Sequence, residues 1–384
     1  MNSTWWVNPK DLDKQQKAVI ELGDKGHFFI EGPPGSGKTN LLLLRAKYLY
    51  KAGQRNLAIV TMARSLKEFI TFGARENKFI ESTVNTFMSL GKAILLQNGI
   101  FFKSNDNYQD SSKQLIVELK NLISRRLAGN DYDCILVDEA QDFSEEELRI
   151  ISQLARNTYF VADSNQRIYN NSTSNIDYLR KFAGEDHCYK LIHHYRNGIK
   201  ICKFADDIIS NDDHIPLADT ANYREEDNPS AVVAIKNDSF ERSIEDLKVR
   251  VSNQLKTYPN ENIGIVVQNN EVLKRLHNAL SEWEHLALCS FHEDGSIIDF
   301  SGDYRIYCLS AFSVKGLEFR AVHMFEWHWR RNLPHNRRLS YMTATRAKTS
   351  LSVYFYDNLY EYFDQAIGNL NPPGALPTIG DLFE

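Results

Sequence analysis

The sequence predicts an α/β protein built on parallel β-sheets with crossover helices. The largely apolar run His27-Phe28-Phe29-Ile30 precedes a glycine-rich loop, and the leucine-rich residues 41–49 that follow it have the pattern of a helix. Strand-like and helix-like segments then alternate along the chain, which is typical of parallel sheets. Continuous apolar runs such as Cys134-Ile135-Leu136-Val137 indicate central strands that are buried on both faces.

The composition is typical of an ordinary soluble globular protein. The 384 residues are 42% hydrophobic and 25% charged, and the length allows two or three domains. A formal net charge of −5 gives no global basic field, although a local basic channel for nucleic acid is compatible with it. Five scattered cysteines without C-x-x-C spacing predict reduced thiols. No signal pattern and no apolar run of about 20 residues is present, so we expect a cytoplasmic protein without a membrane partner.

A phosphate-binding loop is predicted directly after the first strand. The loop matches G-x-x-x-x-G-K-T, and its candidate nucleotide-binding residues are Gly32, Pro33, Pro34, Gly35, Ser36, Gly37, Lys38 and Thr39. Its glycines allow backbone N–H groups to turn toward phosphates at a helix N-terminus. Lys38 is expected to reach the β- and γ-phosphates and the Thr39 hydroxyl to hold Mg²⁺.

Two adjacent carboxylates, Asp138 and Glu139, follow the strand at 134–137. The carboxyl ends of strands are where an open α/β sheet binds its ligand. We therefore expect Asp138 to hold Mg²⁺ and Glu139 to act as the base that orients water. The alternative is a solvated acidic helix cap, since carboxylates are also favoured in a first helical turn. The strand at 159–162 leads to Asp163 and then Gln166, where a polar side chain could sense the γ-phosphate.

The remaining elements are expected from apolar runs and helical spacing. We expect helices at 12–22, 64–70, from 83, at 114–127, 271–280 and 338–348. We expect further strands at 57–61, 231–235, 263–267, 304–309, 321–325 and 351–355. Residues 101–113 and the tail from residue 371 are expected to be irregular. In the first helix, the amide of Gln16 could bind adenine, with a plain surface role and the neighbouring Gln15 as alternatives.

In motif order, the chain resembles the UvrD/Rep/PcrA-type superfamily 1 helicases. The resemblance covers nearly the whole chain and is carried by Gln16, Gly32 to Thr39, Asp138 to Asp142, Asp163 with Gln166, Tyr195-Arg196, Lys315 to Phe319, and Tyr341 with Thr345-Arg346-Ala347. It implies two tandem RecA-like (P-loop) domains with parallel sheets and with ATP and Mg²⁺ as ligands. We expect the first domain at 1–187 with a small helical insertion at about 88–130, the second at 188–370, and a tail at 371–384.

The resemblance also implies roles for single residues. Tyr195 would stack on adenine while Gln16 binds its edge, and Glu318 would contact the ribose. Arg196 and Arg346 would come from the second lobe as arginine fingers, which speed phosphoryl transfer by about 10³–10⁵. Gln166 would couple hydrolysis to motion.

The nucleic-acid motifs depart from the family pattern. Both accessory domains are expected to be reduced or absent, because little chain separates the flanking motifs. Asn85 and Phe312 stand where histidine is usual, and the Trp-Arg pair that follows the Asp163 motif in the family is missing. Each lost stacking platform weakens the grip on single strands by about 1–3 kcal/mol per base. The stretch 327–331, with two tryptophans and two arginines, could compensate or could instead be core packing.

These observations lead to two functional hypotheses. The first is a DNA-dependent ATPase of the superfamily 1 helicase type that binds or moves 3′–5′ on single-stranded DNA. It would act within a DNA-repair or anti-phage complex. The alternative is a regulatory subunit that senses nucleotide or DNA ends and controls a partner nuclease, as in Gabija-type systems. An exposed stretch around Trp327 and the proline-containing tail are its expected docking surfaces.

Overall fold

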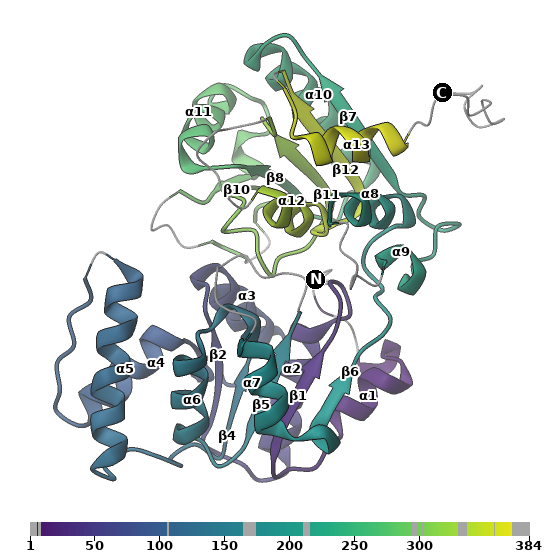
Figure 1. Cartoon of the computed structure of the whole chain (residues 1–384). Helices are drawn as coiled ribbons and strands as arrows, with labels where there is room; N and C mark the ends of the chain where they lie inside the picture. Colours follow the sequence, from purple (N-terminus) through teal and green to yellow (C-terminus); the bar gives the residue numbers. More distant parts are fainter. Residues whose placement is uncertain are drawn as a thin grey trace. The chain divides into compact units, whose positions relative to one another are not determined.

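The computed structural model describes residues 6, 9–105, 107–163, 174–209, 216–293, 298–300, 303–328, 336–356 and 358–370. The chain divides into two compact units (Figure 1). The first comprises Met1–Tyr195, Gly295–Tyr304 and Lys315–Leu317, and the second comprises Arg196–Asp294, Arg305–Val314 and Glu318–Glu384. The chain first passes from the first unit to the second between Tyr195 and Arg196, a few residues after the predicted boundary between residues 187 and 188.

The first unit contains a six-stranded parallel sheet in the order β3-β2-β4-β5-β1-β6. Its strands are β1 (His27–Glu31), β2 (Leu57–Thr61), β3 (Val84–Thr86), β4 (Cys134–Val137), β5 (Thr158–Ala162) and β6 (Cys188–Lys190). Strands β2, β4 and β5 are buried along their whole length. Parallel neighbours need crossover connections, so the carboxyl ends of all these strands meet at one edge.

Seven helices of the described residues surround this sheet. They are α1 (Lys14–Ile20), α2 (Lys38–Lys51), α3 (Arg64–Glu76), α4 (Phe87–Gln97), α5 (Tyr108–Ser124), α6 (Glu145–Leu154) and α7 (Ser174–Ala183). Helices α4 and α5 pack against each other and α5 packs against α6, as Figure 1 shows beside the sheet. Buried leucines and isoleucines of all three join the core beneath β4 and β5.

The second unit contains another six-stranded parallel sheet, in the order β7-β12-β11-β8-β10-β9. Its strands are β7 (Ala231–Lys236), β8 (Ile263–Val267), β9 (Cys289–Phe291), β10 (Ile306–Ser310), β11 (Phe319–Phe325) and β12 (Ala347–Phe355). Its helices are α8 (Ile199–Ile209), α9 (Leu217–Thr220), α10 (Phe240–Thr257), α11 (Asn270–Leu280), α12 (Asn336–Ala344) and α13 (Glu361–Leu370). The two sheets confirm the predicted α/β fold of two tandem RecA-like domains.

Three local predictions are corrected by the structure. Residues 84–86 form strand β3 before the helix begins, because Thr86 caps α4. The segment predicted to be irregular through residue 113 is helical from Tyr108, since the Asn107 side chain accepts a hydrogen bond from the Gln109 N–H and caps α5. Helix α12 ends at Ala344, so Arg346 follows the helix instead of lying on it.

All five cysteines lie within the described residues and are free thiols, four of them buried. Among the described residues, no helix has the length and apolar character that crossing a membrane requires.

Candidate nucleotide-binding site

The predicted phosphate-binding loop joins β1 to α2 at the carboxyl edge of the first sheet. Gly35 and Gly37 have φ angles of +78° and +83°, a region that side chains other than glycine rarely adopt. Gly32 is closely packed, because an added Cβ would lie 2.8 Å from Ser36 Oγ and 2.9 Å from Leu191 Cβ. The loop therefore has the narrow backbone cradle that phosphate binding requires.

The Lys38 ammonium lies inside this cradle. Its Nζ donates hydrogen bonds to the carbonyl oxygens of Gly32 at 2.8 Å and Pro33 at 2.9 Å, and it lies 4.0 Å from Asp163 Oδ2. The side chain is 8% exposed. A buried cation over the turned loop can meet phosphate oxygens with little rearrangement.

Thr39 and Asp138 connect the loop to the end of β4. The Thr39 hydroxyl donates a hydrogen bond of 2.8 Å to Asp138 Oδ2, across 99 positions of sequence. Burial, and then the charge of Glu139, raise the pKa of Asp138 to about 7, although the Thr39 hydrogen bond and Lys38 lower it. A divalent cation would offset this penalty on the charged carboxylate, and Mg²⁺ prefers oxygen ligands of this kind. The donor set therefore fits a nucleotide with Mg²⁺, which Thr39 and Asp138 would hold.

Glu139 is held by a network of buried side chains. Its own φ is +52°, which is unusual for a residue other than glycine. The Gln141 amide donates to the Glu139 carboxylate and accepts a hydrogen bond of 3.0 Å from the Asp163 N–H. Lys315 Nζ lies 3.6 Å from Glu139 Oε2 and 2.7 Å from Asp142 Oδ1. The structure thus shows that Gln141, Asp142 and Lys315 make contacts within the site, a role that the sequence motifs alone did not assign to them.

Gln16 and Tyr195 lie at the other side of the loop. Gln16 Nε2 donates to the Ser36 carbonyl at 3.1 Å, and Gln16 is 7% exposed. The Tyr195 backbone N–H donates to the Gly35 carbonyl at 3.1 Å, and its hydroxyl donates to the Asp13 carboxylate. Asp13 in turn caps α1 through the Gln16 N–H. Both residues predicted to contact adenine are therefore attached to the phosphate-binding loop.

Gln15, the alternative candidate for adenine binding, contacts the end of β6 instead of the phosphate-binding loop. Its Nε2 donates to the Lys190 carbonyl at 2.6 Å, and its Oε1 accepts from the Ile192 N–H at 3.2 Å. These bonds tie α1 to the end of β6, which is a structural role.

The predicted residues of the second unit form a charged cluster of their own. Arg196 pairs with the Glu318 carboxylate and donates to the Thr345 carbonyl at 3.3 Å. Arg346 is 2% exposed and donates from Nε to the Met342 carbonyl at 3.0 Å. Burial alone would raise the pKa of Glu318, but the charges of Arg196, Lys348 and Arg346 lower it below its usual range. Arg196, Glu318 and Arg346 are thus brought together within one unit.

Other sequence expectations are corrected or lie outside the described residues. His194 is fully buried. Trp327 is 1% exposed and donates from its indole N–H to Ser340 Oγ at 2.9 Å, so it is core and offers no docking surface. Gln166, residues 329–331 and the tail from residue 371 lie outside the described residues.

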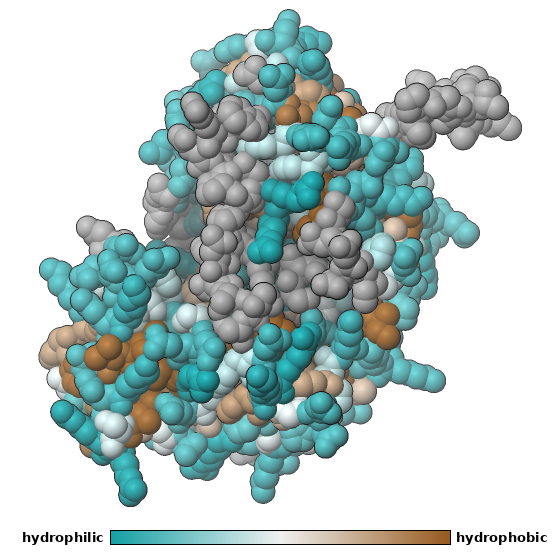
Figure 2. Space-filling view, in the orientation of Figure 1, coloured by the Kyte–Doolittle hydropathy of each residue, from teal (hydrophilic) through white to brown (hydrophobic). Residues whose placement is uncertain are grey.

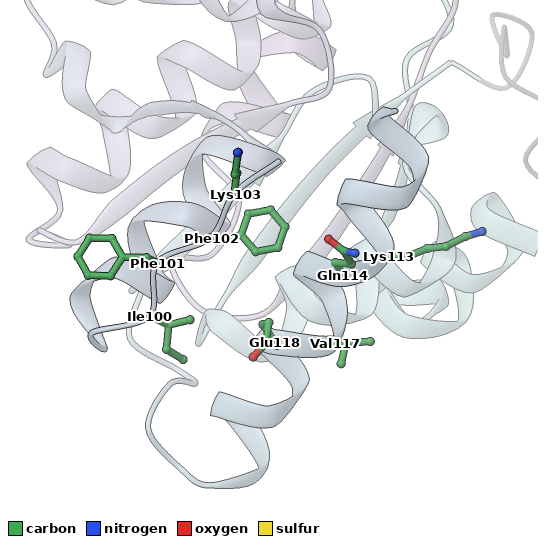
Figure 3. A pocket seen from close by; sticks show the side chains of 8 residues that line it. All are labelled: Ile100, Phe101, Phe102, Lys103, Lys113, Gln114, Val117 and Glu118. Carbon is green, nitrogen blue, oxygen red and sulfur yellow. The ribbon is translucent and has the colours of Figure 1, made fainter. Parts of the chain in front are cut away.

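A separate cavity of about 490 Å³ lies between the segment after α4 and helix α5 (Figure 3). None of its lining residues belongs to the nucleotide motifs; they are Ile100, Phe101, Phe102, Lys103, Lys113, Gln114, Val117 and Glu118. The surface around it is unusually apolar: Leu96, Phe101 and Val117 are 56%, 89% and 55% exposed. We call these three residues the α4–α5 patch; hydrophobic surface gathers over these helices in Figure 2.

Part of the chain matches a known protein family. Residues 15–172 match the family model of an AAA domain. No curated protein matches the chain. Among solved structures, the chain is similar to the C-terminal domain of a possible DNA helicase from Lactobacillus plantarum WCFS1, with 19% identity and a TM-score of 0.33. That similarity covers 46% of this chain and 96% of the other. The family match supports a nucleotide-binding P-loop domain over residues 15–172.

Proposed function

We propose that the chain is a DNA-dependent ATPase of the UvrD-like superfamily 1 helicase type. It would couple ATP hydrolysis to binding or 3′–5′ movement on single-stranded DNA in the cytoplasm, within a DNA-repair or anti-phage complex. The Thr39–Asp138 hydrogen bond carries the proposal, because it joins the phosphate-binding loop to the carboxylates that hydrolysis needs. A chance glycine-rich turn would have no reason to meet a buried acidic pair.

The side chains of the first unit have distinct roles in this proposal. Lys38 binds the β- and γ-phosphates, and Glu139 accepts a proton from the attacking water. Thr39 and Asp138 would hold Mg²⁺, which would supply positive charge against the phosphate oxygens. Gln16 and Tyr195 hold the adenine, and Gln166 is proposed to link the γ-phosphate to motion.

The charged cluster of the second unit supplies the remaining groups. Arg196 and Arg346 are proposed to stabilise charge on the transferred phosphoryl group, and Glu318 to bind the ribose. Both guanidiniums are already ordered by hydrogen bonds to residues 342 and 345. Ordered donors lose little conformational entropy when they engage an anion.

Measuring ATP turnover tests the proposal directly. We expect single-stranded DNA to stimulate turnover more than duplex DNA or RNA, and Lys38→Ala to abolish it. Lys51→Ala is the matched control, because Lys51 is exposed at the other end of the same helix. Absence of DNA-stimulated turnover in the wild-type protein, or an unchanged rate in Lys38→Ala, would refute the proposal.

A second candidate function is a nucleotide-sensing subunit that controls a partner nuclease. The α4–α5 patch favours it, because exposed apolar patches often mark protein interfaces. Co-expression with proteins encoded nearby should yield a complex whose nuclease activity depends on ATP. Phe101→Asp should dissociate that complex and leave ATP turnover unchanged. A chain that elutes alone under these conditions contradicts this candidate.

A further inference from the structure

We propose that Lys315 is a positioning residue for ATP hydrolysis, because its ammonium holds the Glu139 carboxylate and the turn that carries it. The inference rests on the proposed function and names a residue that acts through Glu139. Lys315 itself touches neither ATP nor water in this role.

The contacts of Lys315 lie in the interior of the first unit. Its Nζ lies 2.7 Å from Asp142 Oδ1 and 3.6 Å from Glu139 Oε2. The three residues are 3%, 4% and 7% exposed. A charge with so little access to water interacts strongly with its neighbours, so it constrains where these two carboxylates can lie.

The backbone of Glu139 explains why such a constraint matters. Its φ of +52° places it in the left-handed region, which residues other than glycine rarely adopt. Strained residues persist where surrounding contacts determine their position, and they are common at functional sites. Gln141 donates a hydrogen bond to Glu139 Oε2, and the Lys315 ammonium lies 3.6 Å from the same oxygen.

Lys315 is presented by a closely packed turn. Lys315–Leu317 belong to the first unit, although the residues on either side, Val314 and Glu318, belong to the second. Gly316 has a φ of +80°, and a Cβ there would lie 2.5 Å from Leu66 Cδ1 of α3. Leu317 is fully buried. The turn is therefore closely packed within the first unit.

A purely structural ion pair is the competing explanation. Buried ion pairs are weak evidence for stability, since their desolvation cost can exceed the attraction between the charges. The two explanations differ in what a substitution should change. A structural pair affects folding and nucleotide binding together, whereas a positioning residue affects the chemical step after nucleotide has bound.

The test compares Lys315→Gln, Lys315→Arg and Asp142→Asn with Lys120→Gln. Lys120 makes an exposed ion pair with Glu146 in the same unit and serves as the control. Each variant is measured for kcat, for the Kd of a fluorescent ATP analogue and for its thermal midpoint. A displacement of about 1 Å can cost about 10²-fold in rate.

We expect Lys315→Gln to lower kcat by about 10–10²-fold, with the Kd within about threefold of wild type. Lys315→Arg should recover much of the rate, Asp142→Asn should lower it, and Lys120→Gln should change nothing. Equal rates in Lys315→Gln and wild type overturn the inference, as does joint loss of binding and turnover. If Lys315→Gln does not fold, Lys315→Arg is compared with Asp142→Asn instead. The inference is then overturned when Lys315→Arg binds nucleotide but hydrolyses it no faster than Asp142→Asn. A wild-type protein without turnover would instead contradict the proposed function.

Discussion

Replacing Gly37 by alanine probes the phosphate-binding loop at a position where its backbone is left-handed. Gly37 caps α2 with a φ of +83°, and a Cβ there would lie 3.3 Å from Gln16 Nε2. The left-handed conformation costs alanine about 1–2 kcal/mol. For a domain of about 150–250 residues, each kcal/mol lowers the thermal midpoint by about 2–4 °C. We therefore expect Gly37→Ala to lower the midpoint by about 2–8 °C.

Gly53 provides the matched control for this substitution. It lies just beyond the other end of α2, has a φ of +108°, and an added Cβ would meet nothing within 4 Å. Gly53→Ala should therefore lower the thermal midpoint by a similar amount. Only Gly37→Ala adds a close contact with Gln16 inside the proposed site.

Binding of a fluorescent ATP analogue separates the two variants. We expect Gly37→Ala to weaken binding by about tenfold or more, equivalent to about 1.4 kcal/mol, while Gly53→Ala binds like the wild type. Equal affinities of the two variants would refute the assignment of this loop as the nucleotide cradle. Differential scanning fluorimetry on the same samples shows whether the backbone strain is comparable.

Two further predictions concern the acidic pair and the core of the second unit. Burial and the charge of Glu139 raise the pKa of Asp138 to about 7. Between about pH 4 and 7 the folded protein therefore keeps a proton on Asp138 that the unfolded chain has released. Because of this difference, the free energy of unfolding should fall as the pH rises through about 4–7. Urea unfolding in EDTA should show that Asp138→Asn reduces this slope, to which Asp142, whose pKa burial raises to about 6, also contributes. An unchanged slope would contradict the assignment. Trp327 is 1% exposed, so Trp327→Ala should lower the free energy of unfolding by about 3–5 kcal/mol. In the same urea experiment Val249→Ala, at a position 61% exposed, should stay within about 0.5 kcal/mol of wild type, and equal effects would show that Trp327 is not core.

The sequence predicted the central strands well because burial on both faces leaves a continuous apolar run. Strands β4 and β8 lie where Cys134–Val137 and Ile263–Val267 predicted them. The short strands β6 and β9 were not predicted, since three-residue segments such as Cys188–Lys190 carry too little pattern. Their place in the sheet depends on pairing with β1 and β10 instead.

The candidate site was predictable where its residues are close together in the sequence. It was not predictable where residues far apart in the sequence come into contact. The spacing of Lys38 and Thr39 within one loop is visible in the sequence. The contact of Lys315 with Asp142 spans 173 positions, so only the fold shows it. Trp327 shows the same limit: a tryptophan beside cations left nucleic-acid stacking and core packing both open, and the fold shows that its indole N–H has a buried partner in Ser340.

The most direct test of the proposed hydrolytic site is the turnover of Glu139→Gln compared with its nucleotide affinity. Glutamine preserves the shape of the side chain and removes its capacity to accept a proton. We predict a fall in kcat of about 10²–10⁴-fold with DNA present, while the Kd for the fluorescent ATP analogue stays within about threefold of wild type. A kcat within twofold of the wild-type value would show that Glu139 is not the base, and the carboxylates at the end of β4 would then not form the hydrolytic centre.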